Sequence, residues 1–175
     1  MAEHPIQSQE LVFKGNHIQV RVDRVVDPDG KVWSKEIVIH PGAVCIVAVL
    51  DNGNVVLVRQ YRHAAGQELL EICAGGLNAG EDPMEAAIRE LEEETGYRAG
   101  KIVERARFWT TPGFTTEFMY LYEATELVET QINPDEDESI EVEIVTPQEA
   151  LRMIDDGRIQ DAKSILGLQR VLSGR

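Results

Sequence analysis

The sequence predicts an α/β fold with a mixed sheet, preceded by a small N-terminal antiparallel β unit. Residues 43–50 form a wholly apolar run, as expected of a strand buried on both faces. Residues 83–95 carry apolar side chains at helical spacing. Residues 11–40 contain alternating stretches between strong turn signals, which is typical of antiparallel strands. We therefore expect an N-terminal β unit over residues 1–41 and a main domain over residues 42–175.

The N-terminal unit is expected to be a set of short strands. Residues 11–13 precede a Lys14-Gly15-Asn16 turn, and residues 17–26 alternate apolar and polar side chains. The turn at residues 27–30, Asp-Pro-Asp-Gly, separates them from a strand over residues 32–40. A unit of this size is too small to be stable alone, so we expect it to pack on another surface.

The main domain is expected to alternate strands and helices after the Pro41-Gly42 break. Thr146 and Pro147 give the N-cap and first-turn residues of a helix that runs to Asp155. A last helix covers residues 162–173, with one apolar stripe. The expected strands of this domain lie at residues 43–50, 55–59, 67–72, 101–110, 118–126 and 141–145.

The central helix has clear start and stop signals. Asp82 or Glu81 can serve as the N-cap, and Pro83 stands in the first turn, where a missing N–H costs nothing. Gly96 stands where a left-handed C-terminal residue is favoured. The spacing predicts a buried stripe made of Met84, Ala87, Ile88, Leu91 and Thr95.

The same helix is crowded with carboxylates. Glu90 and Glu94 share one flank of the stripe, one turn apart, with Glu93 on their outer side. Like charges at this spacing cost a few tenths of a kcal/mol per pair. The helix therefore either presents a solvated acidic face or holds a hard divalent cation. Glycines at 75, 76 and 80 would let a loop backbone approach that cation or a phosphate closely.

The formal net charge of −14 is concentrated in two segments. Residues 81–94 contain seven acids and one arginine, and residues 135–143 contain six acids and no base. Such a protein repels nucleic acids and anionic membranes, so we expect neither as a partner. A phosphate substrate would need a metal ion between its own negative charge and the carboxylates of the protein. The two segments either are two solvated surfaces or converge on one cation site.

Other features limit where the protein works and where an anion could bind. No window of about 18 apolar residues exists, and the polar residues 1–10 contain no signal core, so we expect no membrane span and no secretion. Cys45 and Cys73 lie among apolar residues and indicate buried thiols in a reducing cytoplasm. Residues 59–63, Arg-Gln-Tyr-Arg-His, are either surface charge or a place to hold an anionic, partly aromatic substrate.

The pattern around the central helix resembles the Nudix box. Gly75 is followed after five residues by Glu81, then after seven by Arg89-Glu90, and the box closes with Glu93-Glu94, one residue, Gly96 and Tyr97. Every fixed position is filled. Only Tyr97 departs, because that bulky position is more often aliphatic. The resemblance implies the Nudix α/β/α sandwich.

The flanking residues resemble the ADP-ribose pyrophosphatase group of that family. The matching segments are residues 36–43, 58–62, 70–75 and 111–117, including a proline, Pro112, sixteen residues beyond Gly96. One departure is Cys73, where the group usually has proline, and we expect it to change loop rigidity more than chemistry. Relatives that hydrolyse GDP-mannose or other nucleotide sugars share most of these features.

The resemblance implies a role for each matching residue. It implies Mg²⁺, with Mn²⁺ as a substitute, bound by the backbone carbonyl of Ala74 and by Glu90 and Glu94, with Glu93 as a ligand or its neighbour. Arg89 would orient the box carboxylates. Glu136 would be the general base and Glu138 a further metal ligand, two assignments that can be exchanged. Substrate contacts would come from Trp33, Arg62, Glu71, Gly75, Phe114 and Glu117, with Phe13 as an alternative to Trp33.

The resemblance implies a Mg²⁺-dependent hydrolase of the pyrophosphate bond in a nucleoside diphosphate sugar. ADP-ribose is the preferred substrate, giving AMP and ribose 5-phosphate. GDP-mannose or a broader set of nucleotide sugars is the alternative. A third interpretation is a Nudix-fold sensor without catalysis, although such a module is expected to lack the box glutamates. The group also implies a homodimer that can exchange its N-terminal strands.

Overall fold

The computed structural model describes residues 5–133 and 139–173, and the chain divides into two compact units. The first unit lies within Met1–Gly42 and Phe108–Phe118. The second lies within Ala43–Arg107 and Met119–Arg175. No helix in the described part of the chain is both long and apolar enough to cross a membrane.

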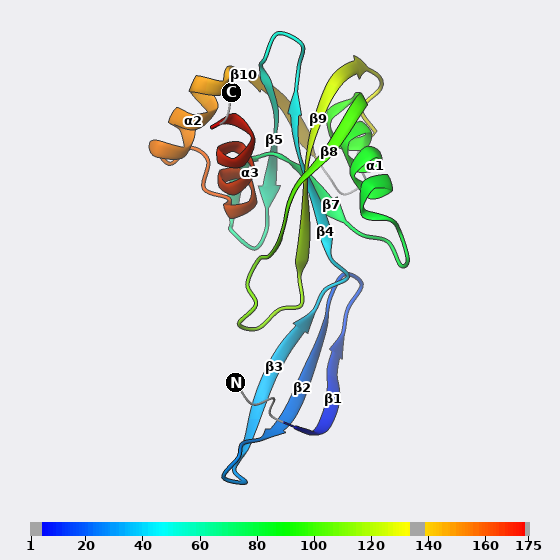
Figure 1. The fold of residues 1–175 in the computed structure, drawn as a ribbon, viewed down its shortest axis with the longest axis vertical. Helices are drawn as coiled ribbons and strands as arrows, with labels where there is room; N and C mark the ends of the chain where they lie inside the picture. The colour runs from blue at the N-terminus through cyan, green and yellow to red at the C-terminus, as the bar shows by residue number, and fades with distance from the viewer. Residues whose placement is uncertain (1–4, 134–138, 174–175) are drawn as a thin grey trace. The chain divides into compact units, whose positions relative to one another are not determined.

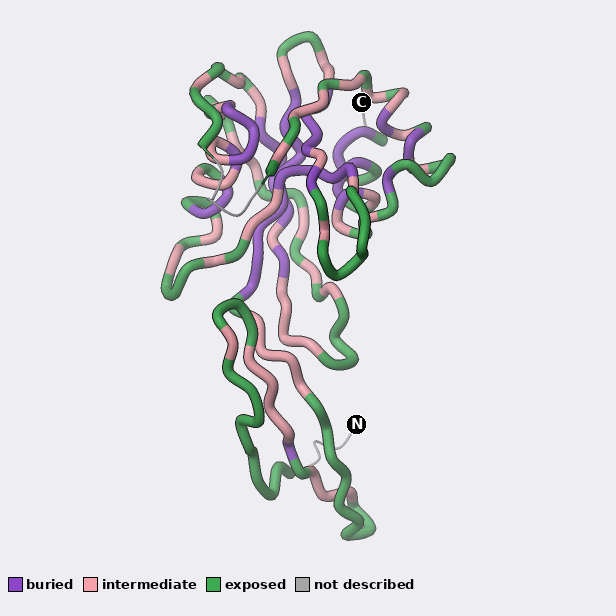
Figure 2. Tube along the Cα trace, turned by 180° about the vertical axis from the view of Figure 1, so that it is seen from behind, coloured by how far each residue is buried: buried purple, intermediate pink, exposed green. Residues whose placement is uncertain are grey.

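The first unit contains a three-stranded antiparallel sheet in the order β1-β2-β3 (Figure 1). Its strands are β1 (Ile6–Lys14), β2 (Gln19–Val26) and β3 (Val32–Ile39). The turn between β2 and β3 is closed by the Asp27 carboxylate, which accepts hydrogen bonds from the N–H groups of Asp29 and Lys31. All residues of β1 are exposed, and little of this sheet is buried (Figure 2). The sheet therefore has too small a core of its own to explain its stability.

The segment Phe108–Phe118 joins the first unit through hydrogen bonds to β3 and the residues after it. The Val38 N–H donates to the Phe114 carbonyl at 2.8 Å, and the Thr116 N–H donates to the Val38 carbonyl at 2.9 Å. The His40 N–H donates to Thr116 Oγ1 at 2.9 Å. We expected these loop residues in the main domain. Local sequence patterns do not predict a grouping that depends on hydrogen bonds between residues more than 70 positions apart. The expected domain boundary at residues 41–42 stays a prediction.

The second unit is built on a mixed sheet. Its path is β10-β5-β4-β9-β8, with β6 paired to β5 and β7 paired to β4. β4 runs parallel to β9 and antiparallel to β5 and β7. The strands are β4 (Ala43–Val49), β5 (Val55–Arg62), β6 (Gln67–Glu71), β7 (Cys73–Gly76), β8 (Tyr97–Trp109), β9 (Phe118–Glu129) and β10 (Ile140–Val145).

Helices cover both faces of this sheet. On one face lies α1 (Pro83–Thr95), whose Ala87 and Leu91 share a buried cluster with Val44. On the other lie α2 (Pro147–Asp155) and α3 (Ala162–Leu172), and α3 comes close to the side chain of Val47. β4 is buried along its whole length between these layers (Figures 1 and 2). The predicted α/β/α sandwich and the predicted strand buried on both faces are confirmed.

The ends of α1 are also confirmed, and its predicted buried face is confirmed at Ala87, Leu91 and Thr95 but not at its other two residues. Asp82 is the N-cap, and Gly96 ends the helix with φ +69°. Met84 and Ile88, which we predicted to be buried, are 42% and 38% exposed. Ala86 and Glu94 are buried in their place. The side of α1 that faces the sheet therefore includes Glu94, because the Glu94 carboxylate accepts a hydrogen bond from the Ala74 N–H of β7.

Candidate metal and substrate site

Glu94 is a buried carboxylate aimed at the strand that precedes the helix. Its exposed fraction is 2%, and its Oε2 accepts a hydrogen bond from the Ala74 N–H at 3.0 Å. Ala74 lies in β7, which pairs with β4 through the partners Cys45 and Ala74. The strand that carries the expected carbonyl ligand is therefore fixed on one side by the central strand and on the other by Glu94. A charge this deeply buried is costly unless it is paired or binds a cation.

Glu90 fills the space that a side chain at position 75 would need. A Cβ atom built on Gly75 would lie 2.0 Å from Cδ of Glu90 and 2.2 Å from each of its oxygens. Position 75 must therefore lack a side chain if Glu90 is to reach the β7 backbone. At the neighbouring Gly76, the same Cβ atom would meet nothing within 4 Å. The glycine requirement at this point of the box is specific to position 75.

Arg89 connects the acids that surround this contact. Its Nη1 donates to Glu90 Oε1 at 2.7 Å and to Glu93 Oε2 at 2.9 Å. Its Nε donates to Glu81 Oε1 at 2.9 Å, and its Nη2 reaches the Gly76 carbonyl at 3.3 Å. The hydrogen bonds from Arg89 and from the Asn78 N–H lower the pKa of Glu81 to about 2. One guanidinium thus orients three box carboxylates and ties the helix to the glycine loop.

The helix itself favours a cation at this place. The carboxyl end of a helix carries a partial negative charge, and acidic side chains there are unfavourable. The last turn of α1 nevertheless has no basic residue and contains Glu93 and Glu94. Carboxylate oxygens in this number suit Mg²⁺ or Mn²⁺. The close approach of the Glu90 carboxylate to Gly75 and the hard oxygen donors therefore fit the divalent cation expected from the sequence.

The described side chains do not complete a metal site by themselves. Among residues 5–133 and 139–173, no three His, Cys, Asp or Glu side chains are grouped closely enough to hold an ion. The expected set includes the Ala74 carbonyl, which is not a side chain. It also includes Glu138, which lies outside the described residues, as does the expected base, Glu136. The roles of Glu90, Glu93 and Glu94 as ligands stay predictions.

Arg62 and Glu71, both expected to contact substrate, are the last residues of β5 and β6 and form an ion pair. Arg62 donates from Nε and Nη2 to the two oxygens of Glu71, at 2.9 and 2.8 Å. Glu71 is 1% exposed, whereas the side chain of Arg62 is 37% exposed. Burial disfavours the charged form of Glu71, but the hydrogen bonds from Arg62 and the charge of Lys163 outweigh it, so its pKa lies below the ordinary value.

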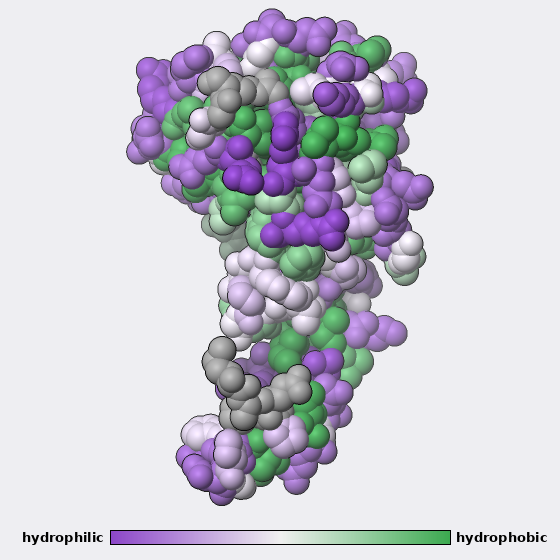
Figure 3. Space-filling view, in the orientation of Figure 1, coloured by the Kyte–Doolittle hydropathy of each residue, from purple (hydrophilic) through white to green (hydrophobic). Residues whose placement is uncertain are grey.

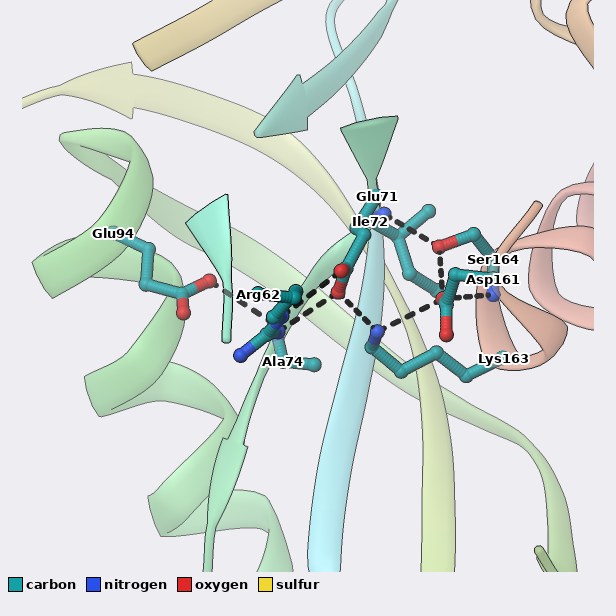
Figure 4. Close-up of polar contacts among 8 residues, drawn as sticks. All are labelled: Arg62, Glu71, Ile72, Ala74, Glu94, Asp161, Lys163 and Ser164. Carbon is teal, nitrogen blue, oxygen red and sulfur yellow. Dashed lines mark hydrogen bonds and ion pairs between the residues drawn. The ribbon is translucent and has the colours of Figure 1, made fainter. Parts of the chain in front are cut away.

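Lys163 is a second cation on Glu71, and sequence reasoning missed it. Its Nζ contacts Glu71 Oε2 and lies 2.8 Å from Asp161 Oδ2 (Figure 4). Asp161 also accepts from the Ser164 hydroxyl at 2.6 Å, and the Ser164 hydroxyl accepts from the Ile72 N–H at 2.9 Å. The local pattern at this point is a helix N-cap, because Asp161 accepts a hydrogen bond from the Ser164 N–H at the start of α3. A contact across 92 positions is not visible in that pattern.

Of the other expected substrate residues, Gly75 lies in β7 of the second unit, whereas Trp33, Phe114 and Glu117 lie in the first unit. Phe114 is 55% exposed and Trp33 is 46% exposed. The Trp33 ring is held at the β2–β3 turn, where Nε1 donates to Asp27 at 3.0 Å and Lys31 lies over the ring. Glu117 accepts a hydrogen bond from the Thr110 hydroxyl at 2.6 Å. The role of these residues in substrate binding stays a prediction.

A cavity of about 550 Å³ lies within the first unit, between β3 and the Phe108–Phe118 segment. The described residues that line it include Trp109 and Phe114 but not Trp33. Lys35 and Glu36 add one charge of each sign. Trp109 packs edge to face against Phe118 with ring centroids 4.8 Å apart, which orients its ring. Sequence reasoning did not single out Trp109.

Comparisons with known proteins find a matching family and similar chains. The NUDIX domain family matches residues 39–167. An ADP-ribose pyrophosphatase of Bacillus subtilis is 42% identical over 93% of this chain and 89% of its own length. A methanol dehydrogenase activator of Bacillus methanolicus is 41% identical over 91% of this chain and 88% of its own length.

A more distant relative and a solved structure extend the comparison. A GDP-mannose pyrophosphatase of Yersinia pestis is 39% identical over 73% of this chain and 69% of its own length. The crystal structure of an ADP compounds hydrolase superposes with a TM-score of 0.88, covering 99% of this chain and 95% of that one. At 22% identity this structure supports the fold alone.

Proposed function

This chain belongs to the Nudix family, and on that basis we propose that it hydrolyses the pyrophosphate bond of a nucleoside diphosphate sugar. ADP-ribose is the proposed substrate, and AMP and ribose 5-phosphate are the proposed products. The observation that carries the proposal is the close approach of the Glu90 carboxylate to Gly75, next to a buried Glu94 on the same helix. The full-length similarity to an ADP-ribose pyrophosphatase supports the choice of substrate.

We propose that Glu90, Glu94 and the Ala74 carbonyl hold Mg²⁺, with Mn²⁺ as a substitute. When bound, the cation would reduce the charge repulsion of the pyrophosphate and acidify a water molecule. Arg89 keeps Glu90 and Glu93 in place through its shared Nη1 donor. Gly75 lets the β7 backbone and the Glu90 carboxylate approach each other. Glu93 completes the set as a ligand or as the neighbour of one.

Residues outside α1 are proposed to transfer the proton and to bind the negative charge of the substrate. We propose Glu136 as the general base and Glu138 as a further ligand, two roles that the resemblance to the ADP-ribose pyrophosphatase group implies and that can be exchanged. Arg62 would bind an anionic group of the substrate, because its guanidinium is partly exposed and has donors that face away from Glu71. Glu117 is proposed as a further polar contact.

The cavity of the first unit is the proposed place for the nucleobase. The exposed rings of Trp109 and Phe114 offer stacking surfaces, and Glu36 offers an acceptor for an exocyclic amine. Trp33 stays a candidate for the same role in an assembly of two copies. An aromatic site lined by both charges would suit a purine better than a bare sugar phosphate.

We propose that the protein is a homodimer that uses its first unit for association. The sheet of this unit has exposed large apolar residues along β1, and Figure 3 shows hydrophobic side chains on its visible surface. These residues are Ile6, Leu11, Val12 and Phe13. A three-stranded sheet with such an edge is expected to gain stability from a second chain. Exchange of the N-terminal strands and a cytoplasmic location remain predictions.

GDP-mannose is the second candidate substrate. The 39% identity to a GDP-mannose pyrophosphatase favours it, although that protein aligns with a smaller part of this chain. A sensor without catalysis is disfavoured because Glu81, Arg89, Glu90, Glu93 and Glu94 are all present.

A substrate panel tests the proposal. The protein is incubated with ADP-ribose, GDP-mannose and UDP-glucose, each with Mg²⁺ and with a chelator, and nucleoside monophosphates are separated by chromatography. We expect the highest kcat/KM with ADP-ribose and no product with the chelator. Faster turnover of GDP-mannose would replace the substrate assignment. Absence of turnover with every compound in Mg²⁺ would contradict the enzyme function.

A further inference from the structure

The carboxylate of Glu71 is shared by two cations that come from distant parts of the second unit. Arg62 reaches it from the end of β5, and Lys163 reaches it from the first turn of α3 (Figure 4). The two side chains approach the carboxylate from different sides (Figure 4). Glu71 is 1% exposed, so it needs a cation at all times, because an unpaired buried charge is strongly unfavourable.

Lys163 is the better fixed of the two cations. Its side chain is 11% exposed, compared with 37% for Arg62. Asp161 Oδ2 holds its Nζ at 2.8 Å, and the same carboxylate caps α3 through the Ser164 N–H at 3.0 Å. The Ser164 hydroxyl, in turn, accepts from the Ile72 N–H. The amino end of α3 is therefore attached both to the side chain of Glu71 and to the backbone of the next residue.

This arrangement leaves Arg62 as the cation that can be shared with a ligand. It uses Nε and Nη2 for Glu71, and a guanidinium has more N–H donors than one carboxylate accepts. If Arg62 turns some of its N–H donors toward an incoming phosphate, Glu71 loses part of its pairing with Arg62. Glu71 then keeps a paired cation because Lys163 stays in place. Without Lys163, Arg62 would be the only one of the two cations left to pair with Glu71. The Glu71 carboxylate would then compete with the ligand for the guanidinium of Arg62.

We propose that Lys163 is a positioning residue for substrate binding, which acts by holding Glu71 so that Arg62 is available to an anionic group of the substrate. This inference rests on the proposed function, since it takes the nucleotide sugar as the ligand of Arg62. It assigns to α3 a part in the site that the Nudix box does not contain. Lys163 need not touch the substrate for this effect.

The test compares four variants by steady-state kinetics with ADP-ribose and by calorimetric titration with ADP-ribose in a chelator. Lys163→Met removes the charge but keeps the length of the side chain. Lys163→Arg keeps the charge, and Arg158→Met is the control, because Arg158 forms exposed ion pairs with Asp156 and Glu149 near the same helix. We expect Lys163→Met to raise KM and the dissociation constant about tenfold with kcat within about twofold, the size expected of a charged hydrogen bond. Lys163→Arg should recover most of the loss.

Each outcome separates this inference from the proposed function. No hydrolysis by the unmodified protein would refute the proposed function. Normal hydrolysis, with KM and the dissociation constant of Lys163→Met equal to those of Arg158→Met, would refute the role of Lys163. A fall in kcat at constant KM would also refute it. Lys163→Gln, which keeps a donor but no charge, is measured in parallel in case Lys163→Met does not fold, and the same criteria apply to it.

Discussion

At the residue scale, the contact between Gly75 and Glu90 makes a sharp prediction. Gly75→Ala should displace the Glu90 carboxylate, because the new Cβ would overlap it at 2.0 Å. The fold should survive, since the displaced atoms are the end of a flexible side chain. We expect affinity for Mg²⁺ and kcat/KM to fall roughly 10- to 100-fold, as they do when the partners of metal ligands are changed.

Gly76→Ala is the matched control for that change. A Cβ atom at this position meets nothing within 4 Å, and the substitution adds the same methyl group one residue away. Mg²⁺ titrations of both variants, followed by calorimetry, make the comparison. Equal losses in the two variants would show that the loop needs glycine for flexibility and not for the approach of Glu90.

The two buried cysteines predict how stability depends on pH. Burial raises the pKa of the Cys45 thiol from 9.0 to about 12, and burial raises that of Cys73 well above 9.0. A group with a raised folded-state pKa contributes its full stability below pH 9 and loses it as the pH rises toward 12. Between pH 8 and pH 10, ionisation of the Cys45 thiol in the unfolded chain should therefore lower the free energy of unfolding by about 1 kcal/mol, and Cys73 should act in the same direction.

Denaturant unfolding of the unmodified protein and of Cys45→Ala, both with a reductant, measures this effect. The unmodified protein should lose about 1 kcal/mol more than the variant between the two pH values, because the alanine has no proton to release. Equal losses would mean that the Cys45 thiol ionises as readily in the folded protein as in the unfolded one.

At the element scale, α3 depends on a glycine to approach the sheet. A Cβ atom on Gly167 would lie 2.8 Å from Ile72 Cδ1 and 3.1 Å from Leu121 Cδ1. Gly167→Val should overpack this contact and destabilise the protein by about 1–3 kcal/mol. Gln169→Val places the same β-branched residue on an exposed position of the same helix and should cost only a few tenths of a kcal/mol. Thermal unfolding of the two variants gives the difference.

Elements were more predictable from the sequence than the contacts between them. The ends of α1 and α2 follow from local chemistry, because Asp82, Thr146 and the prolines after them satisfy the first turn of a helix. The buried face of α1 followed only in part, since Met84 and Ile88 are apolar and Glu94 is charged, yet Glu94 is the buried one. The Ala74 N–H decides that choice, and it lies 20 positions away.

The candidate site divides in the same way. Glu81, Arg89, Glu90 and Glu93 belong to one short segment, so the spacing of the box was enough to bring them together. Lys163 and Trp109 come from segments without a motif of their own, and only the fold shows that Lys163 reaches Glu71. Residues that act through long-range contacts are the ones that a single sequence does not reveal.

At the scale of the whole molecule, the exposed β1 strand predicts self-association. Light scattering should give twice the mass of one chain. Leu11→Asp should shift the protein toward the monomer, because it places a charge on an apolar strand that is exposed in a single chain. Val128→Asp, which changes an exposed apolar residue of β9, should remain dimeric. An unmodified protein with the mass of one chain would refute the dimer.

The box carboxylates are proposed to make this chain a metal-dependent hydrolase of ADP-ribose. Product analysis compares the unmodified protein with Glu94→Gln in Mg²⁺, because glutamine can still accept the Ala74 N–H and so keep the fold. We predict AMP and ribose 5-phosphate from the unmodified protein, and a rate lower by about 100-fold or more from the variant, at the upper end of what even indirect ligand partners cost. Equal product formation by both, with or without Mg²⁺, would contradict the claim.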